Sequence, residues 1–339
     1  MGNAFIAMPG MDENAPFYNP AAINDYKKEL NFRLISPVLD FSTSVISLTK
    51  DVIDMSKDIN GLSDSDTSGK VERFRTFVNK HVGEFNAIDV RLPLIQVMHK
   101  WFALSVLADS RNTFSLRNRS FVNVEIQSRS DVGVVLGGAW SFFEDQMQVG
   151  LNVKPLYRGS IDRTITTDDI INNPNFSDIV SIKRGLGVGF DLGLKGKIPT
   201  FEMAWLDYIK PTVALTWQDI GNTRFQGGAP STRQSISTGF ALHHDFNGWE
   251  VHVANDFRQM NQDIGFLQMW NIGAEVFAPQ LGFFRPSIRI GGNQGYITAG
   301  TSLDLRFFKL EFATYGEESG KFSSQKQLRR LAANLSFGF

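Results

Sequence analysis

From about Gln148 to the end of the chain, apolar residues occupy every second position in stretches of roughly eight to twelve residues. Clusters of polar residues, glycine or proline separate these stretches. In residues 184–195, Leu186, Val188 and Phe190 share one face, whereas glycines occupy most of the other. Because successive side chains of a strand point to opposite faces, each stretch predicts a strand with one apolar and one polar face.

Two architectures produce this alternation: a soluble β-sandwich, whose apolar faces pack together, and a membrane barrel, whose apolar faces meet lipid. The stretches are close to the 9–11 residues that a tilted strand needs to cross a bilayer. Short turns such as 246–248 alternate with long polar loops such as 159–181, 220–232 and 316–328, as in outer-membrane barrels. Aromatic residues suited to interfacial girdles lie near strand ends: Trp140, Tyr157, Trp217, Trp249, Trp270 and Tyr315.

The last stretch of the chain adds an independent signal. Leu335, Phe337 and Phe339 alternate with small or polar residues, and the chain ends on the aromatic residue. This pattern resembles the C-terminal recognition strand of bacterial outer-membrane barrels, which the assembly machinery reads. We therefore expect these three residues to be the assembly signal, and the lipid bilayer and the barrel-assembly machinery to be partners.

The pattern yields fifteen candidate strands, whereas single-chain bacterial barrels have an even number. Counting back from a periplasmic C-terminus places the long loops outside, so the error should lie before residue 147. Either the candidate at 120–128 is wrong or the one at 29–39 belongs to a plug. The prediction is an all-β fold, a closed antiparallel transmembrane barrel of about 14 strands (12–16).

The N-terminal third of the chain departs from strand periodicity twice. Residues 1–28 are rich in Gly, Pro and Asn and show no period. Residues 42–83 show helical spacing, and a Ser/Asp/Gly-rich linker at 63–69 divides them into two predicted helices. The sequence thus predicts an N-terminal segment at 1–28 and a barrel over 29–339, with a helical insert at 42–83.

The N-terminal segment also carries a motif. Residues 2–7 read Gly-Asn-Ala-Phe-Ile-Ala, and residues 12–22 close on Asn19-Pro20-Ala21 after the aromatic pair Phe17-Tyr18. This stretch resembles the start of mature proteins in the FadL-like outer-membrane barrel superfamily. That group includes long-chain fatty-acid transporters, TraF-like proteins of conjugation operons and PorV-type secretion subunits. The Pro37-containing first strand, followed by a helical insert, is most similar to the TraF-like branch.

The resemblance implies that residues 1–28 fold into the lumen as a hatch. In the fatty-acid transporters, hydrophobic substrate is held in an apolar pocket against this hatch and is released when the hatch shifts. Pro16 and Pro20 disfavour regular ladder pairing, which suits a hatch. A core-filling plug without a ligand is the alternative. The expected hatch or ligand residues are Phe5, Ile6, Met8, Phe17, Tyr18, Asn19 and Pro20.

If the apolar faces meet lipid, then the charged residues of the opposite faces line the lumen. Their signs are mixed, so cross-strand ion pairs are expected rather than a selective lining of one sign. Glycines at 185–189 would relieve crowding inside the barrel. The expected lumen-lining charged residues include Lys154, Arg158, Asp191, Glu250, Asp256, Arg258, Glu275, Asp304 and Arg306.

Composition removes other classes of function. A formal charge of −1 offers no basic face for nucleic acid, and the absence of cysteine excludes disulfides and thiolate metal sites. No histidine spacing suits a metal, and no catalytic motif is present. We therefore predict no enzyme, catalytic residue, metal or cofactor. The first residues lack the features of a signal peptide, so we expect the numbering to begin inside a longer precursor of a bacterial outer-membrane protein.

Two functions follow. The leading hypothesis is binding or passive uptake of small hydrophobic, fatty-acid-like molecules through a plugged lumen. The alternative is a non-transporting structural or docking subunit of an envelope secretion or conjugation-type assembly. In the first case the helices at 42–83 should cap a ligand pocket, and in the second they should contact another protein. An apolar lumen pocket would favour transport, whereas a dry, ion-paired lumen would argue against it.

Overall fold

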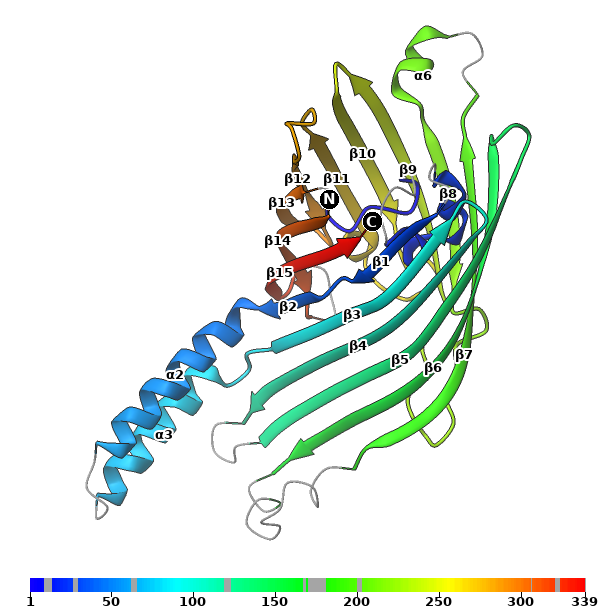
Figure 1. Cartoon of the computed structure of the whole chain (residues 1–339). Helices are drawn as coiled ribbons and strands as arrows, with labels where there is room; N and C mark the ends of the chain where they lie inside the picture. Colours follow the sequence, from blue (N-terminus) through cyan, green and yellow to red (C-terminus); the bar gives the residue numbers. More distant parts are fainter. Residues whose placement is uncertain are drawn as a thin grey trace.

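The computed structural model describes all residues except 9–13, 27–29, 62–65, 119–122, 167–168, 170–180, 200–202, 306, 321–323 and 339. Its main element is an antiparallel β-sheet that closes on itself into a barrel (Figure 1). Strands that follow one another in the chain are hydrogen-bonded neighbours around the wall, and the sheet closes where the first strands meet the last. Closure leaves no free sheet edge, as a β-structure in lipid requires.

The wall contains fifteen strand segments over the described residues. Two of them, β1 and β2, each pair with both β15 and β3, so together they fill one position and the barrel has 14 strands, as predicted. In chain order the segments are β1 (Asn31–Ile35), β2 (Val38–Ser42), β3 (Asn86–His99), β4 (Phe102–Arg117), β5 (Asn123–Phe142), β6 (Met147–Ile165), β7 (Lys183–Lys197), β8 (Thr212–Gln218), β9 (Ser235–Phe246), β10 (Trp249–Phe257), β11 (Trp270–Phe277), β12 (Arg285–Asn293), β13 (Tyr296–Leu305), β14 (Phe308–Glu318) and β15 (Gln327–Gly338).

The break between β1 and β2 lies at Ser36 and Pro37, because proline has no N–H to donate to a neighbouring strand. Neighbouring backbone groups bridge the break. The N–H of Ser36 donates to the carbonyl of Pro93 on β3 at 3.0 Å, and the N–H of Leu335 on β15 donates to the carbonyl of Pro37 at 3.1 Å. The predicted strand at 29–39 therefore belongs to the wall and not to a plug.

The odd strand in the sequence-based count came from β5. β5 runs without a break from Asn123 to Phe142, so ending a predicted strand at residue 128 was wrong, and residues 120–122 of that candidate lie outside the described residues. In the structure Asp131 binds Arg158 on one face of the strand, while the hydroxyl of Ser130 lies 2.9 Å from that of Ser110 on β4.

The two ends of the barrel differ in their connections. One end, here called the short-turn end, holds the turns at 100–101, 143–146 and 247–248, and β15 runs toward it. The other, the long-loop end, holds long connections such as 219–234 and 258–269. Among the described residues, short helices lie in the connections after β7 and β10: α6 (Ala204–Ile209) at the short-turn end and α7 (Phe266–Met269) at the long-loop end.

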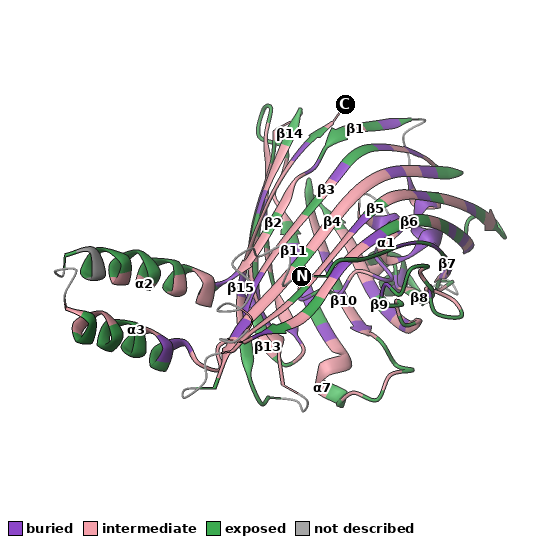
Figure 2. Cartoon of the chain, turned by 90° about the horizontal axis from the view of Figure 1, so that it is seen from below, coloured by how far each residue is buried: buried purple, intermediate pink, exposed green. Residues whose placement is uncertain are grey.

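Buried and exposed residues alternate along the strands (Figure 2), and many of the exposed ones are large apolar residues. On β7, Leu186 and Val188 are 59% and 50% exposed, whereas Gly187, Gly189 and Asp191 are buried. This is the reverse of a soluble β-sandwich, whose apolar faces would be covered. An outer surface this apolar calls for lipid around it, so the strands form a membrane-spanning wall.

Most of the aromatic residues predicted for the girdles face outward. Trp140, Tyr157, Trp217 and Trp249 are between 37% and 47% exposed. Tyr315 is an exception, because its hydroxyl donates a hydrogen bond to the carboxylate of Asp40 across the wall. Its assignment to a girdle was therefore wrong.

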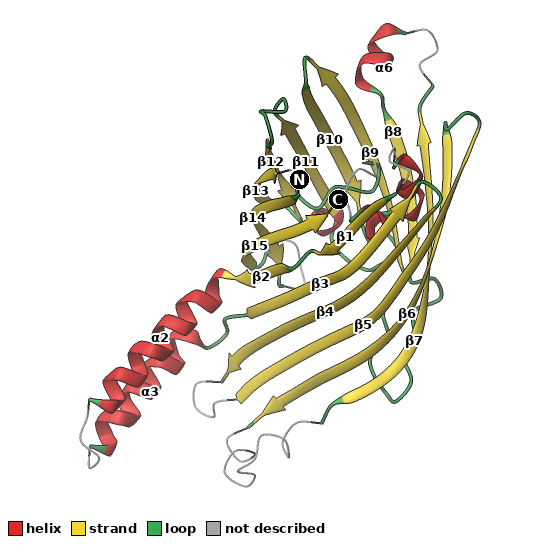
Figure 3. Ribbon diagram, viewed as in Figure 1, coloured by secondary structure: helices red, strands yellow, loops and turns green. Residues whose placement is uncertain are grey.

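The segment expected to be helical contains α2 (Thr43–Asn60) and α3 (Thr67–His81), which lie side by side and are here called the arm (Figure 3). The arm extends away from the barrel in both views, so it does not cover the barrel opening (Figures 1 and 2). No helix among the described residues has both the length and the apolar character needed to cross a membrane.

A charged cluster fastens the two helices together at the base of the arm. The ring of His81 is 1% exposed and lies 2.8 Å from Asp51 of α2 and 2.7 Å from Glu84. The ammonium group of Lys80 lies 2.6 Å from the same Asp51 carboxylate. These contacts join the end of α3 to the middle of α2.

Candidate functional site

The N-terminal segment, residues 1–8 and 14–26, lies inside the barrel (Figure 1). It contains α1 (Ala15–Tyr18) and a 3-10 helix, η1 (Pro20–Asp25). Glycines of the wall allow its backbone to come close. A Cβ at Gly193 would lie 2.9 Å from the backbone nitrogen of Ala21 and would overlap the side chain of Asn19. The barrel wall is thus shaped to this segment rather than to solvent.

Asp256 of β10 holds the first part of the segment. Its carboxylate oxygen Oδ2 accepts hydrogen bonds from the backbone N–H groups of Phe5 at 2.6 Å and Ile6 at 2.9 Å. Asp256 is fully buried, and Ile6 is 2% exposed. Two donors directed at one buried carboxylate fix the position of this backbone turn.

Asn19 of the Asn-Pro-Ala motif connects the two parts of the segment to the wall. Its amide nitrogen donates to the carbonyl of Ile6 at 3.0 Å and to that of Leu194 on β7 at 3.3 Å. Its amide oxygen accepts from the N–H of Ala21 at 3.0 Å and so caps η1, which begins at Pro20. The side chain is completely buried, so both ends of the amide need these partners.

Polar side chains of the wall hold the rest of the segment, mostly through its backbone carbonyls. Lys195 donates to the carbonyl of Met8 at 2.8 Å and forms an ion pair with Asp25. The other tethers are Gln148 to Asp25 at 2.7 Å, Asn152 to the carbonyl of Pro16 at 2.8 Å, and Gln218 to the carbonyl of Phe17 at 2.7 Å. Hydrogen bonds to side chains, rather than strand pairing, thus fasten the segment.

Aromatic and apolar contacts complete the attachment. The rings of Phe5 and Tyr18 are 5.1 Å apart, and the guanidinium of Arg258 lies 5.2 Å from the Tyr18 ring. Ile6 and Met8 are buried in a cluster with small wall residues Ala214, Ala241 and Ala254. These small side chains leave room for the segment inside a 14-stranded barrel.

A cavity of about 260 Å³ lies between the N-terminal segment and the wall, where residues of β2, β3, β11, β12, β14 and β15 line it. Its apolar lining includes Phe5, Tyr18, Val38, Ala313 and Ala332. Its charged lining includes Glu275, Arg289 and Glu311. Arg289 lies 2.6 Å from each of the two glutamates, so these charges are already paired.

Ion pairs also cover other parts of the lumen wall, as the mixed signs predicted. Lys154 lies 2.7 Å from Asp191 and 2.9 Å from Asp219. Close to the short-turn end, Glu250 lies 3.1 Å from Arg285. A lining of paired charges favours neither cations nor anions.

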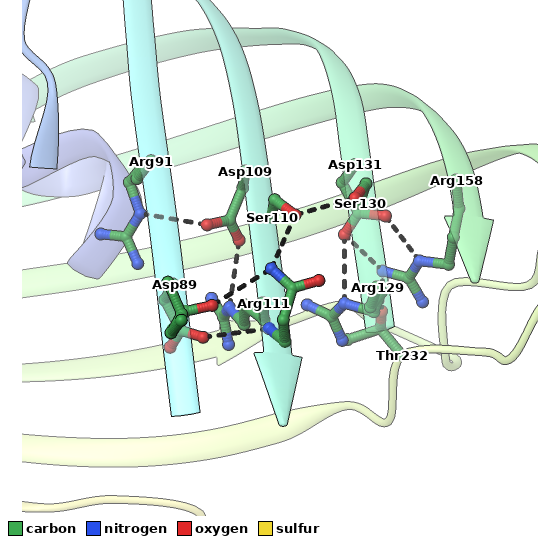
Figure 4. A network of polar contacts seen from close by, with 12 residues as sticks. Asp89, Arg91, Asp109, Ser110, Arg111, Arg129, Ser130, Asp131, Arg158 and Thr232 are labelled. Carbon is green, nitrogen blue, oxygen red and sulfur yellow. Dashed lines mark hydrogen bonds and ion pairs between the residues drawn. The ribbon is translucent and has the colours of Figure 1, made fainter. Parts of the chain in front are cut away.

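A network of polar contacts joins β3, β4, β5 and β6 toward the long-loop end (Figure 4). Arg158, which is 1% exposed, binds both carboxylate oxygens of Asp131, at 2.6 and 2.7 Å. It also donates to the carbonyl of Pro230 and to Thr232, and it lies 3.8 Å from the ring of Phe225. The connection between β8 and β9 therefore folds against the lumen wall. Glycines Gly185 and Gly187 of β7 make room for it.

A second arginine stabilises the seam where the barrel closes. Arg330 of β15 lies 2.8 Å from Asp40 of β2, 2.6 Å from Asp89 of β3 and 3.4 Å from Glu317 of β14. The lumen-lining charged residues expected from the sequence did not include Arg330, Asp40 and Asp131. All three could have been found from the alternation pattern, because each lies on the polar face of its strand.

The remaining residues predicted to line the lumen or to form the assembly signal contribute less to the site. Asp304 is exposed at the end of β13, and Arg306 lies outside the described residues, as does Phe339. Phe337 of the expected assembly signal faces outward at 38% exposure, and its ring centre is 6.2 Å from that of Phe308. Among the described residues, no group of three histidine or acidic side chains is arranged to hold a metal ion.

Comparison with solved structures finds barrels with a similar fold. The chain is similar to the toluene transporter TodX of Pseudomonas putida at 11% identity, covering 100% of this chain and 96% of that chain with a TM-score of 0.53. It is also similar to the deltaS2S3 mutant of the TodX monoaromatic hydrocarbon channel at 10% identity, covering 96% and 94% of the two chains with a TM-score of 0.52. No protein-family model and no curated protein matches the sequence. At these identities the likeness shows a shared fold.

Proposed function

We propose that the chain is an outer-membrane channel through which small hydrophobic molecules diffuse, with the N-terminal segment as its hatch. The observation that carries this proposal is the attachment of that segment beside a cavity. Hydrogen bonds of the segment with Asp256 and Lys195, and from its Asn19 to the carbonyl of Leu194, hold it, and such contacts can be exchanged for water without unfolding the wall. The fold shared with TodX, described as a toluene transporter, supports the same function.

The size of the cavity limits the substrate. Ligand pockets usually measure about 300–1,000 Å³, and an apolar cavity of about 150 Å³ is enough for benzene. At about 260 Å³, this cavity suits a molecule of one ring or a short chain. A long fatty acid would need the hatch to move first.

The paired charges of the lumen also bear on the mechanism. An ion-paired wall argues against a permanently open hydrophobic passage, and we assign it to the closed state. Because the charges within each ion pair cancel, an uncharged molecule could pass along the wall without desolvating an unpaired charge. In this proposal the long-loop end faces outward, and the end of β15 that carries Leu335 and Phe337 lies at the periplasmic side, as in other barrels.

The proposal is tested by filling the cavity. Ala332 lines it, whereas Ala299 on β13 is exposed on the outer face of the wall. We expect Ala332→Trp to weaken binding of radiolabelled toluene or octanoate to the purified protein at least about tenfold, a loss of about 1.4 kcal/mol. Ala299→Trp should leave binding unchanged. Equal binding by both variants and the parent chain would contradict the proposal.

The alternative, a docking subunit of an envelope assembly such as the TraF-like proteins, rests on the arm. The arm does not cap the lumen, and its exposed apolar side chains call for a contact of some kind. Site-specific crosslinking from the arm in native membranes tests this alternative, which fails if lipid and not protein is labelled.

A further inference from the structure

Large apolar side chains of the arm lie open to the surroundings. Ile46, Val52 and Ile53 of α2 and Val71 and Phe74 of α3 are between 40% and 59% exposed. Five such residues on two neighbouring helices form more than the scattered apolar surface that soluble proteins tolerate. Helix–helix packing does not cover them, so another surface is needed.

One side of α2 forms a shallow apolar groove of about 560 Å³. Phe41, Val45, Ile46, Thr49 and Ile53 line it, with the spacing of residues that share one helix face. The charged residues Lys50, Asp54 and Lys57 complete its lining. An apolar stripe bordered by lysines is typical of helices that lie in a membrane interface, where the long side chains reach the phosphate layer.

The wall below the arm continues this apolar face. Leu39 is 46% exposed on the outer face of β2, and Phe41 lies two residues further on, at the end of the groove. On β3, Ile88 pairs with Phe41. Ile88 and Val90 flank Asp89, which points the other way to Arg330. Along β2 and β3 the outward positions Leu39, Phe41, Ile88 and Val90 therefore stay apolar as far as the base of the arm.

The neighbouring strands behave differently. On β4 and β5 the faces next to this surface become polar toward the long-loop end, where Ser110 bonds Ser130 and Ser128 bonds Asn112. These strands thus leave the membrane before they end. The arm instead begins at Thr43 directly after β2, level with the lipid-facing surface, and extends sideways from the wall (Figure 2).

We propose that the arm is a membrane-surface anchor: the groove of α2 rests on the lipid leaflet at the long-loop end, and Lys50 and Lys57 contact its phosphate groups. The partner is the lipid surface itself, because the groove continues the surface that already meets lipid. This contact would hold the barrel at a fixed depth and orientation, and it does not depend on any transport activity.

The cysteine-free chain allows a direct test by single-site labelling. The full chain, reconstituted in phospholipid vesicles, carries an environment-sensitive fluorophore at Ile53→Cys or, as the control, at Ser47→Cys on the polar side of α2. We expect lipids brominated on their acyl chains to quench the probe at position 53 at least twofold more than the probe at position 47. Ile46→Asn should reduce quenching at 53 while the barrel stays folded.

Two results would overturn the proposal. Equal quenching at positions 47 and 53 would mean that the arm stands free in water. The second result is energy transfer between copies labelled at position 53 that persists on dilution with empty lipid, together with no quenching by bromolipid. It would mean that a second copy of the chain covers the groove.

Discussion

The carboxylate of Asp256 accepts a hydrogen bond from the backbone N–H of Ile6 at 2.9 Å, although the two residues are 250 positions apart in the chain. A hydrogen bond to a charged group contributes about 1.5–3 kcal/mol. We expect Asp256→Ala to raise the amide hydrogen-exchange rate of Phe5 and Ile6 at least about tenfold. Asp256→Asn, which keeps one acceptor oxygen, should show a smaller rise. Unchanged amide hydrogen-exchange rates in both variants would show that Asp256 does not hold this part of the N-terminal segment.

Asn19 provides a sharper test, because its amide both donates and accepts. Asn19→Asp replaces a donor that serves the carbonyls of Ile6 and Leu194 with a second acceptor, so oxygen would face oxygen. Asn19→Ala only removes the contacts. We expect the aspartate variant to release residues 1–26 more completely than the alanine variant, measured by limited proteolysis of the folded barrel. The reverse order would contradict the assignment of the donor.

Two glycines of β7 form a matched pair. A Cβ at Gly193 would overlap the side chain of Asn19, whereas a Cβ at Gly196 would meet nothing closer than 3.8 Å. Gly193→Ala should displace the N-terminal segment and produce ion-conducting events in planar bilayers, while Gly196→Ala should stay closed. If both variants stay closed, a fitted hatch is not what blocks the lumen.

Arg330 should matter for closure of the barrel. Removing it leaves the carboxylates of Asp40, Asp89 and Glu317 facing one another, and loss of one partner of a buried pair costs about 3–5 kcal/mol. We expect Arg330→Met to lower the temperature at which the barrel loses its heat-modifiable mobility on gels. Adding Asp40→Asn to this variant should restore part of the loss, whereas a further decrease would contradict repulsion at the seam.

The base of the arm should respond to acid. Hydrogen bonds from Lys80 and His81 hold the pKa of Asp51 below its ordinary value. A depressed folded-state pKa means that the contribution of Asp51 is present above its unfolded pKa and is lost as pH falls through the folded value. Spin labels on α2 and α3 should therefore separate at pH values below about 4 and not at neutral pH. Asp51→Asn should abolish this pH dependence, and an unchanged transition would assign it to another group.

The sequence predicted the barrel because the alternation of apolar and polar positions is a property of the whole wall. The strand prediction failed locally, where polar residues of a strand point into the lumen. The candidate strand at 120–128 stopped short of Asp131, which pairs with Arg158 of β6 inside a continuous strand. Such pairing depends on strand register, which a single sequence does not specify.

The sequence predicted that the N-terminal segment lies in the lumen, but not which wall residues hold it. The motif around Asn19 pointed to the lumen segment, but its anchors Asp256 and Lys195 lie far away in the chain, and only the closed barrel brings them together. The direction of the arm was not predictable. The apolar spacing at 42–83 fits a cap, a docking surface and a membrane contact equally well.

If hydrophobic molecules enter the lumen beside the hatch, a small diazirine-bearing aromatic probe should label the residues that line the cavity. The labelled protein is analysed by mass spectrometry, with and without competition by excess toluene. Entry by this route predicts toluene-sensitive adducts on the cavity residues Phe5, Tyr18 and Ala332, and loss of those adducts in Ala332→Trp. Adducts confined to outward-facing residues such as Leu186 and Ile297, and insensitive to toluene, would contradict it.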